Sequence, residues 1–173
     1  MDIQLLPLDS QDKELVYTLY NDENIIKNAV LGSWKPHSIE YAETRIERWN
    51  SDDKQQHFKI AHNGEGVGLA QIYQINPVNR KCVLGILILS KYQSAGVGQN
   101  VLTTLIDVCF QQLNLRKIEV SILSYNDKSI RLVEKNQFKK EGVLRKSVFK
   151  DGTYYDVYLY GLLKEEIGLL DKR

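Results

Sequence analysis

The feature that most restricts the fold of this chain is an apolar run that leads through a glycine-containing loop into a long amphipathic helix. Cys82 to Leu89 is almost continuously apolar, which is typical of a central strand buried on both faces. Gln93 to Gln99 follows and contains Gly96 and Gly98, whose missing side chains allow a ligand to approach the backbone closely. Val97 to Leu113 then repeats apolar residues at helical spacing. Such a junction leaves N–H groups unpaired in the loop and first helical turn, and these favour an anion, typically a phosphate.

The rest of the chain predicts one α/β domain of all 173 residues, with a mixed central sheet flanked by helices. Asn63-Gly64 lies between two apolar runs and predicts a hairpin. Residues 21–36 are expected to be irregular, and residues 164–173 form a charged tail that we expect to be peripheral. In chain order, the expected elements are a strand over 2–6, a helix from about 10 to 20, a helix capped by Ser38 and running to 49, strands over 57–62, 67–75 and 82–89, a helix over 97–113, a strand over 117–123, a helix over 127–135, and a final hairpin of strands over 143–149 and 154–162.

Composition excludes several classes of function. The chain has 23 basic and 22 acidic residues, so its net charge of +1 predicts no nucleic-acid or membrane partner. Its beginning lacks the pattern of a signal peptide, and its longest apolar run is far shorter than the roughly 20 residues that span a bilayer. Cys82 and Cys109 both lie in apolar runs, which favours buried thiols in a reducing compartment over a disulfide. We therefore expect a cytoplasmic protein.

Two familiar nucleotide-binding motifs do not explain the glycine loop. The dinucleotide fingerprint requires a glycine or alanine where this chain has Val101, and the Gly-Lys-Ser/Thr of a P-loop is absent. A pyrophosphate-binding loop of another type remains, beside the simpler interpretation of a tight strand-to-helix turn. His37, His57 and His62 are too scattered to predict a metal site, although His57 is a candidate base.

A longer set of motifs resembles the GNAT acetyltransferases. Gln93-x-x-Gly96-x-Gly98 after an apolar strand is similar to their acetyl-CoA motif, Gln/Arg-x-x-Gly-x-Gly/Ala. Within the family, the stretch from Ala70 to Leu162 resembles the RimJ/RimL branch, and there the spermidine acetyltransferases and the amino-sugar acetyltransferases of pseudaminic acid synthesis. The similarity continues through Leu115–Ile118, Asn126–Ile130, Glu134–Phe138, Glu141–Leu144 and Asp151–Asp156.

The resemblance implies acetyl-CoA as co-substrate and a set of residues that hold it. In the family, the strand before the loop splays from its neighbour, and its backbone pairs with the pantetheine arm; here that strand contributes Ile86, Leu87 and Ile88. The pyrophosphate would be held by the loop and first helical turn, which are Gln93, Ser94, Ala95, Gly96, Val97, Gly98 and Gln99. The resemblance places Asn126 near the pantetheine arm, and near the other end of the cofactor it places Lys128, Ser129 and Lys135.

The expected chemistry is direct attack of a neutral primary amine on the thioester, which needs positioning, a donor for the carbonyl oxygen and an acid for the thiolate. The chain departs from the family at the acid, because Val133 stands where a tyrosine is usual. A glutamate common on the strand before the loop is also missing from Cys82-Val83-Leu84. The catalytic acid is therefore unknown; the candidates are Tyr125 and Tyr154, beside Ser124, Tyr155 and water.

The acceptor is the least constrained part of the expectation. An amino sugar or a polyamine leads, an N-terminal or ribosomal-protein acetyltransferase is the alternative within the same chemistry, and a non-catalytic acyl-CoA sensor is the alternative outside it. A homodimer is possible. Asp22, Glu23 and Glu40 are candidates to hold a cationic amine or simply solvated residues. Core packing is the favoured interpretation of Trp34 and Trp49 over a place in the acceptor pocket.

Overall fold

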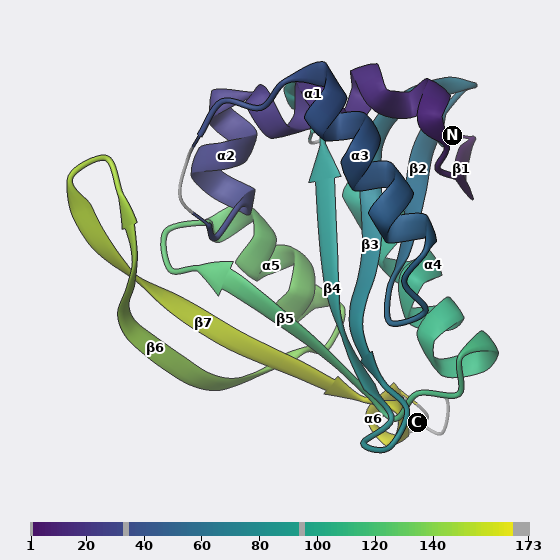
Figure 1. Cartoon of the computed structure of the whole chain (residues 1–173). Helices are drawn as coiled ribbons and strands as arrows, with labels where there is room; N and C mark the ends of the chain where they lie inside the picture. Colours follow the sequence, from purple (N-terminus) through teal and green to yellow (C-terminus); the bar gives the residue numbers. More distant parts are fainter. Residues whose placement is uncertain (1, 33–34, 94–95, 168–173) are drawn as a thin grey trace.

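A computed structural model describes residues 2–32, 35–93 and 96–167 and shows one seven-stranded mixed sheet with helices on both faces (Figure 1). The strands are β1 (Ile3–Pro7), β2 (Gln56–His62), β3 (Glu65–Asn76), β4 (Lys81–Ile88), β5 (Lys117–Leu123), β6 (Lys139–Lys150) and β7 (Thr153–Leu163). The α-helices are α1 (Lys13–Asn21), α2 (Glu23–Ala29), α3 (Ile39–Asn50), α4 (Val97–Asp107), α5 (Asp127–Lys135) and α6 (Lys164–Ile167). The expected α/β class and mixed sheet are confirmed.

The strand order, β1-β2-β3-β4-β5-β7-β6, places β4 at the centre of the sheet. Neighbours pair antiparallel except for β4 and β5, which run parallel. One face packs against α4 and α5 in a large apolar core that includes Val101, Leu105 and Val133. The other face packs against α1 and α3, where Leu69 and Leu87 meet the helices. Cys82 and Leu84 of β4 pack into the first core and Leu87 into the second, so side chains on both faces of the strand hold it in place.

Local signals in the sequence explain where the helices begin. The side chain of Ser38 accepts a hydrogen bond from the N–H of Tyr41 and caps α3, as expected. The side chain of Asp9 caps the 3₁₀ turn Ser10–Asp12 that leads into α1, through a reciprocal capping box with Asp12. These caps satisfy N–H groups that have no partner within the helix.

The expectation that residues 21–36 are irregular is wrong, because α2 forms within that segment. The side chain of Asp22 caps the helix by accepting from the N–H of Ile25, and both Ile25 and Ile26 are buried. A seven-residue helix has too few apolar positions to show a period, so burial against the sheet decides its formation. The buried amine of Lys150, on β6, donates to the carbonyl oxygens of Ile26 and Gly32 and ties the β6–β7 hairpin to this segment.

The other differences concern the ends of elements. The helix expected over 97–113 is α-helical only to Asp107 and continues as a π-helical segment, η3 (Val108–Gln112). β6 begins at Lys139, four residues earlier than its apolar pattern begins, because as an edge strand it is largely exposed. The charged tail starts as α6, whose Glu165 and Glu166 pair with Arg116 and Lys139, and residues 168–173 lie outside the described part.

The two cysteines are buried and free, as expected. Their sulfur atoms lie 3.6 Å apart, and the neighbouring Cys109 thiol, together with burial, raises the pKa of Cys82 far above its ordinary value. The Cys82 thiol therefore stays protonated and is a poor nucleophile, and both cysteines pack in the apolar core. None of the helices within the described residues combines the length and apolar character needed to cross a membrane.

Candidate functional site

The strands β4 and β5 separate shortly after they begin. Their parallel pairing covers only Lys81–Val83 against Lys117–Glu119, whereas β4 stays paired with β3 as far as Ile88. Figure 1 shows the two strands spreading apart, with α5 behind the gap. This divergence explains a difference from the sequence analysis: β4 is central but not buried throughout, since Ile86 and Ile88 remain partly exposed.

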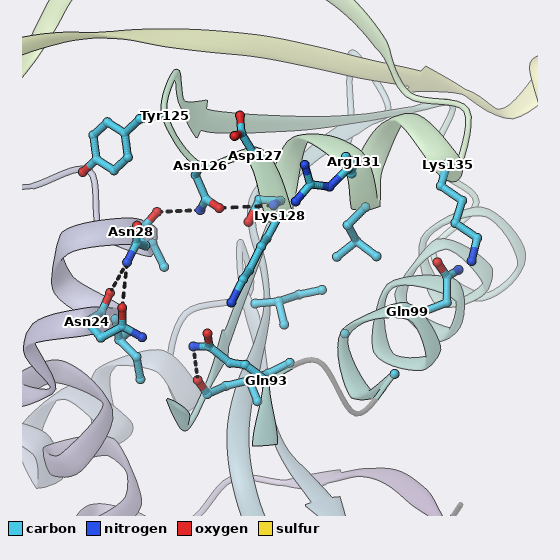
Figure 2. Close-up of a pocket in the computed structure, with 18 residues that line it drawn as sticks. Asn24, Asn28, Gln93, Gln99, Tyr125, Asn126, Asp127, Lys128, Arg131 and Lys135 are labelled. Atoms are coloured by element: carbon cyan, nitrogen blue, oxygen red, sulfur yellow. Dashed lines mark hydrogen bonds between the residues drawn. The ribbon is translucent and has the colours of Figure 1, made fainter. Parts of the chain in front are cut away.

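The open edge of β4 presents backbone groups to this gap. The N–H of Leu89 donates to the carbonyl oxygen of Val67 on β3. Because backbone groups alternate in direction along a strand, the N–H and C=O of Ile86 and Ile88 face the β5 side. The side chain of Gln93 confirms this direction, since its Nε2 donates to the carbonyl oxygen of Ile88 over 3.0 Å (Figure 2). The gap therefore offers an edge on which an extended ligand with amide groups can pair.

The start of α4 closes one end of the gap. Gly96 precedes the helix with a φ of 78°, a left-handed conformation that other residues adopt only with strain. No acidic side chain occupies the first turn, so the N–H groups and helix dipole of α4 are not compensated there. A Cβ added at Gly98 would lie 3.6 Å from the side chains of Ile88 and Leu132, which is an ordinary contact distance. Ser94 and Ala95, predicted for the same loop, lie outside the described residues.

The helix α5 forms the opposite wall. The side chain of Asn126 accepts from the N–H of Ser129 and so caps α5, and it donates to the carbonyl oxygen of Asn28 on α2 over 2.8 Å. Lys128 extends from α5 across the cavity in the direction of Gln93 (Figure 2). Lys128, Arg131 and Lys135 line the cavity together with Asp127, so the wall opposite the α4 N-terminus carries three cations and one carboxylate.

These walls enclose an open cavity of about 910 Å³, within the usual range of ligand pockets. The predicted residues that line it are Ile86, Ile88, Gln93, Gly96, Gly98, Gln99, Tyr125, Asn126, Lys128, Ser129 and Lys135. Two predicted residues do not line the cavity: Val97 is fully buried, and the Leu87 side chain packs against the α1 and α3 core. Sequence reasoning missed Asp127, Arg131 and Leu132 on α5. It also missed the α2 wall of Asn24, Ile25, Asn28 and Ala29, because only the fold brings α2 to this place.

The two tyrosine candidates differ in position. Tyr125 lines the cavity, its hydroxyl donates to the carbonyl oxygen of Lys27, and its ring meets Tyr155 edge-on at 4.6 Å. Burial, with the nearby Tyr155, raises the pKa of Tyr125. Tyr154 is 62% exposed on the β6–β7 hairpin, packs against Phe149, and is not a lining residue. Val133 is buried in the core, so nothing in its place supplies a proton.

A polar and aromatic cluster lies on the other face of β4. A Cβ on Gly85 would meet Oε1 of Gln71 at 2.9 Å, so Gly85 allows Gln71 to lie across the strand. Gln71 donates to the Tyr20 hydroxyl and also lies within hydrogen-bonding distance of His57. His57 stacks on Trp49 at 4.1 Å, and burial, reinforced by the Arg45 charge, lowers the pKa of His57 to about 4. His57 is therefore neutral near pH 7.

The carboxylates considered for a cationic amine have other roles. Asp22 caps α2 and accepts a hydrogen bond from the hydroxyl of Ser90. Glu40 lies in the exposed first turn of α3, where hydrogen bonds from the backbone and from Ser38 lower the pKa of its carboxyl. Glu23 is exposed at the start of α2. Trp49 is buried in the core, as expected, while Trp34 lies outside the described part.

Comparison with known proteins agrees with this geometry. The family model described as an acetyltransferase (GNAT) domain matches residues 7–159. The spermidine N(1)-acetyltransferase of Escherichia coli K12 is 26% identical over 152 residues, which cover 88% of this chain and 81% of that protein. A Bacillus subtilis protein that carries the provisional name of a ribosomal N-acetyltransferase is 29% identical over 154 residues, covering 83% and 84%.

A solved structure shows that the similarity also holds in three dimensions. The spermidine N-acetyltransferase of Vibrio cholerae, in complex with CoA and spermine, superposes with a TM-score of 0.88 at 25% identity, covering 94% of this chain and 96% of that one. The family model alone spans most of the chain. The chain therefore belongs to the GNAT family and is an acetyl-CoA-dependent N-acetyltransferase.

Proposed function

We propose that this enzyme transfers acetyl from acetyl-CoA to a primary amine of a small molecule, and that the transfer takes place in the cavity between β4 and β5. The observation that carries the proposal is the unpaired edge of β4, which points at the same space as the uncompensated N-terminus of α4. One ligand that needs both is an extended chain of amides ending in a pyrophosphate.

The described residues fit that ligand. In this proposal the edge-facing groups of Ile86 and the N–H of Ile88 pair with pantetheine amides, while the carbonyl oxygen of Ile88 already accepts from Gln93. The N–H groups after Gly96, together with Lys128 and Arg131 across the cavity, are placed to receive phosphate oxygens. The cofactor supplies an acetyl thioester, whose carbonyl carbon is open to attack by an amine. An N–H of the β4 edge is a fixed donor for the oxygen on which charge develops, and it needs no reorganisation during the reaction.

Proton transfer is the step for which this chain lacks the usual group. We propose Tyr125 as the donor to the leaving thiolate, since it lines the cavity and its hydroxyl is protonated before the reaction. The amine loses one proton as the amide forms, and this proton restores the Tyr125 hydroxyl, so the products are the amide and the neutral thiol. The present partner of the Tyr125 hydroxyl is the carbonyl oxygen of Lys27, so donation requires that hydrogen bond to break. A free thiol has a pKa of about 8.5, so departure without an acid is slower but feasible.

A small amine is favoured over a protein substrate by the spermidine acetyltransferases among the relatives. The test is release of CoA, with product identified by mass spectrometry, on amino sugars, polyamines, amino acids and N-terminal peptides. We expect rapid acetylation of one class of small amine and at most slow acetylation of peptides. Preferential acetylation of a peptide N-terminus would instead favour the ribosomal-protein alternative, and binding of acetyl-CoA without turnover on any amine would favour the sensor.

A further inference from the structure

A second hollow, of about 410 Å³, lies beside α3 on the face of the sheet opposite α4. Its centre is the guanidinium of Arg45, which packs over the rings of Tyr20 at 4.5 Å and Trp49 at 5.0 Å. The hollow is lined by Glu40, Tyr41, Thr44, Arg45, Arg48, Trp49 and Gln55. An aromatic wall of this kind suits a cation, but here the protein itself provides the cation.

The hydrogen-bonding capacity of Arg45 is only partly used. One terminal nitrogen donates to the Tyr41 hydroxyl over 2.7 Å. Its Nε is buried and has no hydrogen-bond partner, and among the described residues no carboxylate forms an ion pair with Arg45. A buried donor without a partner loses its hydration and gains nothing in return, so it marks a place where a partner is missing. The donors of a guanidinium match the oxygens of a carboxylate or a phosphate.

A short chain of contacts joins Arg45 to the proposed reaction centre. Arg45 packs on Tyr20, and the Tyr20 hydroxyl accepts from Gln71. Gln71 lies across Gly85, the residue before Ile86, whose backbone faces the cofactor gap. Gln71, Tyr73 and Gly85 are partly exposed on this face, so the sheet is open between α3 and the β4 edge. A small molecule with its amine at that edge would extend over this partly exposed face, on the side of the sheet that carries Arg45.

The charges around this path favour an anion over a polyamine. Near pH 7, His57 is neutral, and it offers only its ring nitrogens for hydrogen bonding. Glu119, on the same face, is neutralised by Lys81 at 3.0 Å and Lys117 at 3.4 Å. Glu40, which lines the hollow, is exposed, and its carboxyl accepts hydrogen bonds at the start of α3. A polycation would meet the repulsion of Arg45, and the nearby carboxylates of Glu40 and Asp52 already accept hydrogen bonds, from Ser38 and from Gln55.

We propose that the acetyl acceptor is a primary amine that also carries a carboxylate or a phosphate, and that Arg45 binds this anionic group. The inference rests on the proposed function and specifies the acceptor class for the same site. Arg45 is then a specificity-determining residue, and Tyr20 with Trp49 holds its guanidinium in place.

The experiment compares matched amines that differ in one anionic group. Lysine is paired with cadaverine, and glucosamine 6-phosphate with glucosamine, and kcat/KM is measured for each. We expect at least one anionic member to exceed its partner by 10-fold or more, which also distinguishes carboxylate from phosphate. Arg45→Gln should abolish the preference, mainly through KM, and Arg45→Lys should restore part of it. Arg145→Gln removes the same charge from the exposed β6 and should keep the preference.

Two results would overturn the inference. One is equal or faster turnover by the wild type of both members that lack the anionic group, cadaverine and glucosamine. The other is a preference that persists in Arg45→Gln while circular dichroism shows that the variant is folded. If acetyl-CoA fails to bind, the proposed function itself is wrong. Calorimetric titration of the free protein with the same matched amines then still tests the anion site at Arg45. Binding of an anionic member that is lost in Arg45→Gln supports it, and no such binding rejects it.

Discussion

At the scale of single residues, Tyr125 carries the proposal for proton transfer. We expect Tyr125→Phe to lower kcat by about 100-fold, the lower end of what general acids contribute, with little change in the KM for acetyl-CoA. Tyr154→Phe is the matched control, because Tyr154 does not line the cavity and should keep wild-type kcat. A fall of less than threefold in Tyr125→Phe, in steady-state CoA release, would show that the thiolate leaves without this tyrosine.

His57 makes the stability of the protein depend on pH. Its pKa is about 4 in the fold and 6.5 when exposed, so the unfolded chain binds the proton more tightly. The stability that neutral His57 provides is fully present above pH 6.5 and is lost as the pH falls toward 4. This loss amounts to about 3 kcal/mol. Urea unfolding at several pH values should show that His57→Gln loses less stability than the wild type over this range; parallel curves would contradict the account.

At the scale of elements, the cap of α5 joins two walls of the cavity. Asn126→Ala removes the cap and the link to Asn28 on α2, so we expect a loss of about 1–2 kcal/mol in stability and weaker binding of acetyl-CoA. Ser38→Ala removes the cap of α3, which is not part of the cavity. It should cost similar stability in urea unfolding and leave the affinity unchanged. If both variants bind acetyl-CoA with equal affinity, the cap of α5 does not contribute to cofactor binding.

Elements with strong local signals were predictable, and elements decided by packing were not. β5 and α5 have the expected bounds, because alternation and a helical period fill their whole length. α2 was missed because its two buried isoleucines only gain a partner when the sheet is present. Part of the site could not be predicted for the same reason. The glycine loop is visible in the sequence, but the α2 wall and the place of Arg45 beside Tyr20 depend on helices packing across the sheet.

At the scale of the whole molecule, the edge strand β6 supports the prediction of a homodimer. This edge strand carries several lysines but also exposes the apolar side chains of Val143, Leu144 and Phe149, and these apolar positions favour association. Sedimentation equilibrium should give twice the monomer mass for the wild type. Leu144→Lys, which places a charge on an already exposed position, should shift the protein to monomer without lowering its stability. A wild-type monomer at all concentrations would contradict the prediction.

The central claim is that the cavity between β4 and β5, closed by the start of α4, binds acetyl-CoA. Calorimetric titration of the wild type, Gly98→Leu and Thr104→Leu with acetyl-CoA tests it most directly. The Cβ of a leucine at position 98 lies at contact distance from its neighbours, and the rest of the side chain takes up space in the cavity that Gly98 lines. Thr104 is exposed on α4 outside the cavity. The account predicts binding by the wild type and by Thr104→Leu, and a loss of at least 10-fold in affinity for a folded Gly98→Leu. Unchanged affinity in Gly98→Leu would place the cofactor elsewhere and contradict the account.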